Sequence, residues 1–499
     1  MTTPTDRSGL APTAVPIRRV GLGIVALMVV LVGQLTYVQL GRADQLNADP
    51  SNVRVVLRDF ARSRGPILTI DEAVVARSVP IADEYGFQRE YPDGPLYAHI
   101  SGFQSLRFGL TGIEQQYDDV LLGKTFKIGF GDLDNLITVD DPEGTVVLAV
   151  DSVAQATARA ALGSNRGSVV VLDVRTGGVV AMYSNPTYDP NAIANHDPNV
   201  AGEFFDAYVD DPANPMRSRA YRERYPAGST FKVVTTGVGI DQGVTNPTQQ
   251  YPELEQLELP LTDRTLSNFG GNECGGTLAE SFRDSCNTTF GQVGLDLGEL
   301  FPPGVEQYGI NTAPPPIDLS PPMVESLGPV AGTFDTDAPL FAQAAIGQGP
   351  VATTPMAMAM IAQCVASGGT MLVPQFMAEI RDQDGKTVER AQRSVYAQCM
   401  TPTTAAAVTT MMVDVVENGT GTAAQLDNVV VAGTTGTAQQ PGGAPHAWFV
   451  GFAPADAPQY AIAVVVERGG DLGDEATGGR VAAPIAREMF ATLLTAEPV

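Results

Sequence analysis

Residues 167–186 read GSVVVLDVRTGGVVAMYSNP, which is two short apolar runs joined by a turn at Thr176, Gly177 and Gly178. Runs rich in β-branched residues on either side of a glycine-containing turn predict a β-hairpin. The pattern changes at this point, because residues 41 to about 160 contain only short apolar stretches broken by glycine, proline and charged residues. A globular domain is therefore expected to begin here, after a smaller mixed module.

The C-terminal end of this domain returns to strand patterns. Helical patterns occupy its middle, at residues 229–242, 278–295, 338–346, 355–367 and 403–416. Strand patterns follow in VVVAGTTGTAQ (429–439), HAWFVGFAPA (446–455) and YAIAVVVERGG (460–470), before a last helix at 481–495. Strands at both ends with helices between them imply an α+β domain, in which the terminal strands share one antiparallel sheet with helices packed on its faces.

An apolar segment lies near the N-terminus. Residues 20–40 read VGLGIVALMVVLVGQLTYVQL and contain no charge, and about 20 apolar residues are enough to cross a bilayer as a helix. Arg18 and Arg19 lie directly before it, so the positive-inside rule places residues 1–19 in the cytoplasm and the rest of the chain outside. A cleaved signal peptide is the alternative, but no A-x-A site follows the apolar run. We expect a single uncleaved membrane anchor.

The composition argues against several other classes of function. A formal net charge of −26 disfavours nucleic acid as a partner, because phosphate binding needs clustered Lys and Arg. Neither a C-x-x-C pair nor a Cys/His cluster occurs, so we expect no metal site and no cofactor. Cys274 and Cys286 flank a Gly-Gly turn and are the first candidates for a disulfide, whereas Cys364 and Cys399 fit buried thiols equally well.

The stretch YPAGSTFK (225–232) is the first candidate for chemistry. Pro226 and Gly228 precede a helical run, so Ser229 falls at or near a helix start and Lys232 follows on the same face. A lysine that is kept neutral can accept the proton of a serine nucleophile, and backbone N–H groups at a helix start can stabilise an oxyanion. Taken alone, this motif is better explained by a serine N-cap with a surface lysine one turn further on.

Two further stretches complete a set. Ser285 and Asn287 lie at the head of another apolar helical run, where a hydroxyl could relay a proton and an amide could hold Lys232 or a substrate carbonyl. Helix capping is the simpler reading of both residues. The third stretch is a strand with small side chains, and it contains Thr434, Thr435, Gly436 and Thr437.

In this order, the three motifs resemble those of the penicillin-recognising serine transpeptidases. The resemblance is greatest to class B, monofunctional penicillin-binding proteins of the actinobacterial penicillin-binding protein A type, and it covers nearly the whole chain. The segments that carry it outside the three motifs include SRGPIL (63–68), YPDGPLYAHISGF (91–103), GLTGIEQQYDDVLLG (109–123), AIGQGPVATTPMAMA (345–359) and HAWFVGFAPAD (446–456). It implies a pedestal or dimerisation domain at 41–160 and a β-lactamase-like serine transpeptidase domain at 161–499.

The family chemistry implies a role for each motif. Ser229 would attack the D-Ala–D-Ala carbonyl of a peptidoglycan stem peptide with Lys232 as its base, while Ser285 and Asn287 assist. The backbone N–H groups of Ser229 and Thr437 would form the oxyanion hole, and residues 431–439 would be the edge strand on which the peptide lies. The implied partners are stem peptides, lipid-linked wall precursor, β-lactams, the cell membrane and other wall-synthesis or division proteins. A D,D-carboxypeptidase uses the same residues and stays open, whereas a β-lactamase needs a deacylating base that we do not find.

Thr434 departs from the family pattern, which has lysine before Thr435. A cation there attracts the substrate or penicillin carboxylate and disfavours the charged form of the nearby lysine. Three explanations stay open: Arg468 replaces the missing charge, the enzyme is slower or adapted to another substrate, or the protein is a catalytically degenerate scaffold in a wall-synthesis or division complex. The remaining motif residues favour a working transpeptidase over a scaffold.

Overall fold

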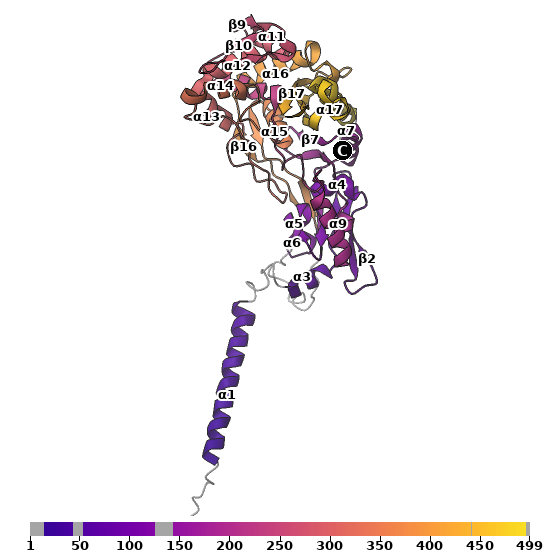
Figure 1. Cartoon of the computed structure of the whole chain (residues 1–499). Helices are drawn as coiled ribbons and strands as arrows, with labels where there is room; N and C mark the ends of the chain where they lie inside the picture. The colour runs from indigo at the N-terminus through magenta and orange to yellow at the C-terminus, as the bar shows by residue number, and fades with distance from the viewer. Residues whose placement is uncertain (1–13, 43–52, 125–142, 441, 496–499) are drawn as a thin grey trace, which may run out of the picture. The chain divides into compact units, whose positions relative to one another are not determined.

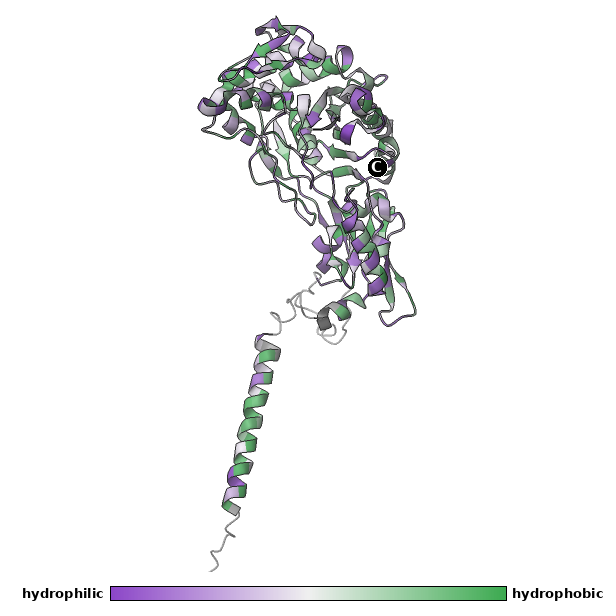
Figure 2. Cartoon of the chain, viewed as in Figure 1, coloured by the Kyte–Doolittle hydropathy of each residue, from purple (hydrophilic) through white to green (hydrophobic). Residues whose placement is uncertain are grey.

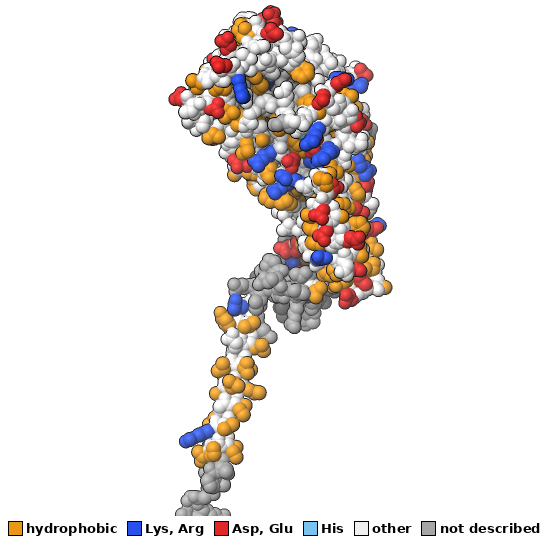
Figure 3. Space-filling view, viewed as in Figure 1, with side chains coloured by type: hydrophobic (Ala, Val, Ile, Leu, Met, Phe, Trp, Pro, Cys, Tyr) orange, Lys and Arg blue, Asp and Glu red, His pale blue; other side chains and the backbone are white. Residues whose placement is uncertain are grey.

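The computed structural model describes residues 14–42, 53–124, 143–440 and 442–495, in two compact units, Met1–Arg62 and Ser63–Val499. The first unit contains the helix α1 (Ala14–Thr36), a π-helical turn at Tyr37–Gly41 and the helix α3 (Val53–Phe60). Residues Val15–Thr36 are long and apolar enough to cross a membrane. Figure 2 colours most of α1 as hydrophobic, and Figure 3 shows hydrophobic side chains along it. The predicted apolar helix is therefore present, although it begins before Arg18 and Arg19.

The second unit is built around a five-stranded antiparallel sheet (Figure 1). Its order is β17-β18-β19-β7-β8, and the strands are β7 (Gly167–Asp173), β8 (Val179–Asn185), β17 (Ala432–Gln440), β18 (Gly443–Ala453) and β19 (Tyr460–Val466). The predicted hairpin is confirmed, because Gly177 N–H donates to Asp173 O at 2.9 Å and β7 pairs with β8. The predicted sharing of one sheet by the terminal strands is also confirmed, with β17 at its edge.

Helices cover both faces of this sheet. Consecutive residues of β7, β8 and β19 are buried, which requires cover on each side because strand side chains alternate between the two faces. The covering helices are α15 (Pro355–Ala366), which packs on β7, β18 and β19, α17 (Gly478–Thr495), which packs on β17, β18 and β19, and α7 (Ser152–Leu162), which packs on β8 and α17.

The helices that follow β8 differ in detail from the sequence prediction. The 229–242 region is a 3₁₀ turn, η3 (Gly228–Phe231), followed by α10 (Lys232–Asp241). The 278–295 region is two helices, α11 (Leu278–Arg283) and α12 (Asn287–Leu297), because Ser285 takes a left-handed backbone with φ of 62° and interrupts the helix. The other helices of this part are α8 (Pro190–Ile193), α9 (Pro198–Asp210), α13 (Phe301–Glu306), α14 (Phe334–Ala345) and α16 (Pro402–Asn418).

A second, six-stranded sheet has the order β15-β14-β6-β1-β2-β3. Its strands are β1 (Ile67–Leu68), β2 (Val74–Pro80), β3 (Phe87–Glu90), β6 (Thr145–Leu148), β14 (Met377–Arg381) and β15 (Thr387–Arg390). Strands β14 and β15 come from residues 161–499, which were expected to form the transpeptidase domain. Helix α7 begins within residues 41–160, which were expected to form the pedestal. The domain limits at 41–160 and 161–499 therefore stay predictions.

Further helices and short strands belong to the same unit. The helices are α4 (Gly94–Ser101), α5 (Gly112–Gln116) and α6 (Asp118–Leu121), and the strands are β4 (Gln104–Ser105), β5 (Gly109–Leu110), β9 (Gln250–Leu254), β10 (Gln256–Glu258), β11 (Thr265–Ser267), β12 (Cys274–Thr277), β13 (Thr370–Leu372) and β16 (Val395–Gln398). Glu114 on α5 is fully buried between two guanidinium groups, with Arg64 Nη2 at 3.0 Å and Arg89 Nε at 2.6 Å from its carboxylate oxygens. This ion cluster links the start of the module to β3 and α5.

Candidate active site

Ser229 lies in η3 on the wall of a cleft of about 1040 Å³. The turn depends on two glycines in close contact. Gly228 has φ of 56° and its N–H donates to Gly347 O at 2.9 Å. A Cβ on Gly347 would lie 2.1 Å from Gly228 O, so a side chain there would displace the turn. Trp448 Nε1 on β18 donates to Pro226 O at 3.0 Å and anchors the chain just before the serine.

Lys232 begins α10, one turn after Ser229, and its side chain is buried. Its Nζ donates to Ser285 O at 2.7 Å, to Asn287 Oδ1 at 2.9 Å and to Ser285 Oγ at 3.1 Å. Burial holds the pKa of Lys232 well below its usual value of 10.5, because a charged ammonium loses its hydration there. The three oxygens accept hydrogen bonds from all three N–H groups of the Lys232 ammonium and so stabilise its charged form. Burial has the opposite effect and favours the neutral amine.

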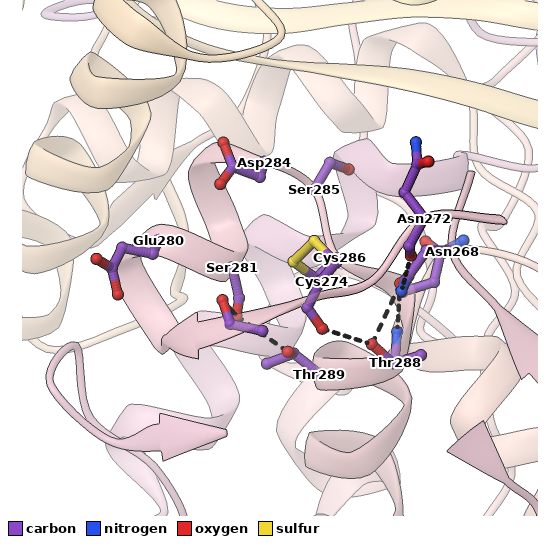
Figure 4. Close-up of a disulfide and its surroundings, with 12 residues drawn as sticks. Asn268, Asn272, Cys274, Glu280, Ser281, Asp284, Ser285, Cys286, Thr288 and Thr289 are labelled. Atoms are coloured by element: carbon purple, nitrogen blue, oxygen red, sulfur yellow. Dashed lines mark hydrogen bonds between the residues drawn. A yellow bond between two sulfur atoms is a disulfide. The ribbon is translucent and has the colours of Figure 1, made fainter. Parts of the chain in front are cut away.

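Ser285 and Asn287 reach Lys232 from the break between α11 and α12. Cys286 lies between them, and its N–H donates to Ser281 O at 2.8 Å. Its sulfur is bonded to that of Cys274 on β12 (Figure 4), with the two Cα atoms 5.5 Å apart. The structure therefore confirms the first candidate disulfide. It also joins Cys364 to Cys399, both fully buried, so the alternative reading of that pair as free thiols is wrong.

Strand β17 contributes another part of the cleft wall. Thr435, Thr437 and Gln439 line the cleft, whereas Gly436 faces the other way, since a Cβ there would lie 2.9 Å from Ala227 O. Thr435 Oγ1 donates to Thr420 Oγ1 at 2.7 Å. Thr434 lies on the inner side together with Gly436, is 4% exposed, and is not among the residues that line the cleft.

The cleft is acidic. Glu253, Glu273 and Asp284 line it, and no Lys or Arg does so within the described part of the chain. Arg468 is exposed, and its backbone N–H donates to His446, which pairs with Ala438 rather than with Thr434. The structure thus gives no support to Arg468 as the replacement for the missing lysine.

Sequence reasoning missed the wall contributed by residues 265–275 and the one contributed by Thr477 and Gly479 at the start of α17. The only sequence signal for the first wall was the Cys274 pairing, which ties that segment to Asn287 and its neighbours. No such signal marks the second wall. Among the described residues, no group of three or more His, Cys, Asp or Glu side chains is arranged to hold a metal ion.

Comparison with protein families identifies both parts of the second unit. Residues 167–491 match the penicillin binding protein transpeptidase domain, and residues 64–147 match the penicillin binding protein A dimerisation domain. The chain therefore belongs to the class B penicillin-binding proteins.

Individual relatives agree with this assignment. The chain is 37% identical to the peptidoglycan D,D-transpeptidase PbpA of Mycolicibacterium smegmatis, over 96% of this chain and 98% of that protein. It is 35% identical to the PbpA of Mycobacterium tuberculosis, over 97% and 99%. Among solved structures it is similar to the ceftriaxone acyl-enzyme complex of penicillin-binding protein A from M. tuberculosis, with a TM-score of 0.81, 33% identity, and coverage of 88% of this chain and 100% of that one.

Proposed function

We propose that this protein is a peptidoglycan D,D-transpeptidase that works through a Ser229 acyl-enzyme. The observation that carries the proposal is the hydrogen-bonded group of Lys232, Ser285 and Asn287, one helical turn from a serine on the wall of a cleft. A buried lysine with a lowered pKa is suited to take a proton from a serine hydroxyl. The names of the PbpA relatives and the acyl-enzyme complexes of penicillin-binding protein A support the same reaction.

The reaction then proceeds in two acyl transfers. Ser229 Oγ attacks the carbonyl between the two terminal D-alanines, and its proton passes to neutral Lys232. The oxyanion is stabilised by the backbone N–H groups of Ser229 and Thr437, the C–N bond breaks, and D-alanine leaves with a proton relayed through Ser285. The amine of a second stem peptide then attacks the acyl ester and gives a proton to Lys232, the ester C–O bond breaks as the cross-linking amide forms, and the proton returns to Ser229 Oγ.

The edge position of β17 supports strand addition as the binding mode. An edge strand offers unpaired backbone groups to an extended peptide, and Thr435 and Thr437 face the cleft beside it. A β-lactam would enter by the same route, because its strained amide presents a carbonyl to Ser229.

We propose a single-pass arrangement for the whole chain. Helix α1 would be the anchor, with residues 1–19 in the cytoplasm because Arg18 and Arg19 lie at that end, and the catalytic region would lie outside the membrane. The module within residues 41–160 would act as a pedestal and as the contact surface for other wall-synthesis or division proteins.

A catalytically degenerate scaffold is the second candidate, favoured by the absence of a basic side chain among the described residues that line the cleft. Intact mass spectrometry decides between the two. The full-length protein in detergent is incubated with penicillin G beside Ser229→Ala. A stable adduct of one penicillin on the wild type, lost in the variant, supports the transpeptidase. No adduct on folded wild-type protein at high drug and long times supports the scaffold.

A further inference from the structure

A largely buried carboxylate lies behind the turn that carries Ser229. Glu467 directly follows β19, its side chain is 10% exposed, and it is not among the residues that line the cleft. Its Oε1 accepts hydrogen bonds from the Tyr225 hydroxyl at 2.8 Å and from Arg219 Nε at 2.7 Å, and its Oε2 lies 3.0 Å from Arg166 Nε. This carboxylate therefore ties the end of a central strand to the segment that leads into the nucleophile turn.

Tyr225 connects the carboxylate to that turn. It lies four residues before Ser229, is 4% exposed, and exchanges two backbone hydrogen bonds of 2.8 Å with Thr353. Its ring meets the rings of His446 and Trp448 edge-on, with centroids 5.2 and 6.1 Å away. Burial and the neighbouring carboxylate hold the pKa of Tyr225 well above its usual value of 10, so its hydroxyl stays a hydrogen-bond donor. Packing thus fixes the backbone and the ring, and the carboxylate fixes the hydroxyl.

The residue after Glu467 reaches the other side of the site. Arg468 has a left-handed backbone with φ of 51°, and its N–H donates to His446 Nδ1 at 3.2 Å. His446 on β18 pairs with Ala438 on β17, next to Thr437, whose N–H is the second proposed oxyanion donor. Two consecutive residues after β19 therefore contact both the segment before the nucleophile turn and the pair of strands that carries the second donor.

We infer that Glu467 is a positioning residue for the acylation of Ser229, because its hydrogen bond to Tyr225 sets the nucleophile turn against β17. The inference rests on the proposed function for its rate readout. Glu467 does not line the cleft, so its effect reaches Ser229 through Tyr225. A displaced turn slows the chemical step more than it weakens binding, because the hydrogen bonds to the oxyanion reach full strength only in the transition state.

Two substitutions break the link between Tyr225 and Glu467. Tyr225→Phe removes only the hydroxyl and keeps the ring against His446 and Trp448. Glu467→Gln keeps the shape of the side chain but replaces one acceptor oxygen by an NH₂ donor, in a place surrounded by three donors. We expect the acylation step to slow about tenfold in each variant, which is the effect of losing one hydrogen bond to a charged group. The dissociation constant of the initial penicillin complex should stay within about twofold of wild type. The double variant should match Glu467→Gln, because both changes break the same link.

Tyr221 supplies a matched control. It lies four residues before Tyr225, is 3% exposed, and its hydroxyl makes no hydrogen bond to another of the described residues. Tyr221→Phe therefore removes a buried hydroxyl from the same segment without breaking a hydrogen bond, and acylation should not change. Glu114→Gln is the control for stability, because it removes a buried carboxylate from a pair of arginines that do not line the cleft. It should weaken the fold and leave the acylation step unchanged.

The experiment is stopped-flow acylation of the full-length protein in detergent by a fluorescent penicillin, over a range of drug concentrations that separates the dissociation constant from the acylation step. An unchanged acylation step in Tyr225→Phe and Glu467→Gln would overturn the inference. An equal fall in Tyr221→Phe or Glu114→Gln would also overturn it, because the effect would then be one of general stability.

If the wild type is not acylated, the proposed function fails instead, and hydrogen exchange at the backbone N–H groups of residues 228–232 then decides the inference. Faster exchange in Tyr225→Phe, confined to this turn, supports the positioning role. Exchange equal to that of the wild type refutes it.

Discussion

Replacing Thr434 by lysine should place a positive charge beside a cleft whose described lining has none. Thr434 lies on the inner side of β17, two residues before Gly436, where the strand packs against the turn that carries Ser229. The described residues that line the cleft include three carboxylates and no Lys or Arg, so an anionic substrate or penicillin meets an unfavourable field. A lysine at this position would attract that carboxylate and would disfavour the charged form of Lys232.

The expected gain is the favourable interaction of the new ammonium with an anionic ligand, reduced by the cost of burying that ammonium. Two unit charges 4 Å apart interact by about 4 kcal/mol at an effective dielectric constant near 20, and a hydrogen bond to a charged group contributes about 1.5–3 kcal/mol net. Thr434 is 4% exposed, so burial of the new ammonium places the gain at the lower end of that range. We expect the acylation rate to rise by about tenfold, which corresponds to about 1.4 kcal/mol.

The assay is the second-order rate of acylation by penicillin across pH, with Thr434→Met as a control of similar length and no charge. Thr434→Lys should be faster than wild type, and its acid-side midpoint should lie at lower pH because the added cation lowers the pKa of Lys232. A folded Thr434→Lys protein with a rate within twofold of wild type would refute the reasoning. An equal gain in Thr434→Met would attribute the effect to packing.

Three other outcomes test the structure. Acylation should slow as the pH falls through the pKa of Lys232, which burial holds well below 10.5, because protonated Lys232 cannot accept a proton; an acid-side profile without a fall would contradict this role. Gly347→Ala should slow acylation, because its Cβ would lie 2.1 Å from Gly228 O. Gly385→Ala is the control, because Gly385 has a similar positive φ but open space around it, and it should leave the rate unchanged. Equal acylation rates in the two variants would show that the turn adapts. Glu114→Gln should lower the free energy of unfolding in urea by about 3–5 kcal/mol, because buried Arg89 loses its charged partner while buried Arg64 is left with Asp118, and a change below about 1 kcal/mol would argue against the ion cluster.

The ion cluster also makes stability depend on pH. Burial alone would raise the pKa of Glu114, but the Arg89 and Arg64 guanidinium groups hold it below its usual value of 4.5. The stabilisation by this carboxylate is therefore present at neutral pH and is lost as the pH falls through the lowered pKa. The same urea titration, repeated at falling pH on wild type and Glu114→Gln, should show the two curves converge.

Local patterns in the sequence were enough to predict the features built from neighbouring residues. The 167–186 hairpin, the apolar N-terminal helix and the Cys274–Cys286 pair all depend on short-range signals, and the structure confirms them. The break at Ser285 was missed, because helical periodicity continues across it and only the backbone conformation of one residue interrupts the helix.

Features that depend on distant contacts could not be predicted in the same way. The position of Arg468 relative to Thr434 depends on the strand register. From the sequence, Arg468 was expected to lie near Thr434, whereas the register places it near His446, which pairs with Ala438. The pairing of Cys364 with Cys399 depends on how α15 packs beside the chain that leads into α16. In both cases the local sequence is enough to identify a strand or a cysteine, but not to predict which distant residue it contacts.

Strand β14 lies between β15 and β6, although it follows α15 in the chain and β6 precedes the β7–β8 hairpin. The chain therefore passes from the six-stranded sheet to the five-stranded sheet, back to the six-stranded sheet and again to the five-stranded one, so a single cut in the chain cannot separate the two sheets. A truncated protein beginning at residue 161 would keep β14 but lose its partner β6, and would expose an open strand edge prone to intermolecular pairing. The six-stranded sheet and the five-stranded sheet should accordingly unfold as one cooperative unit.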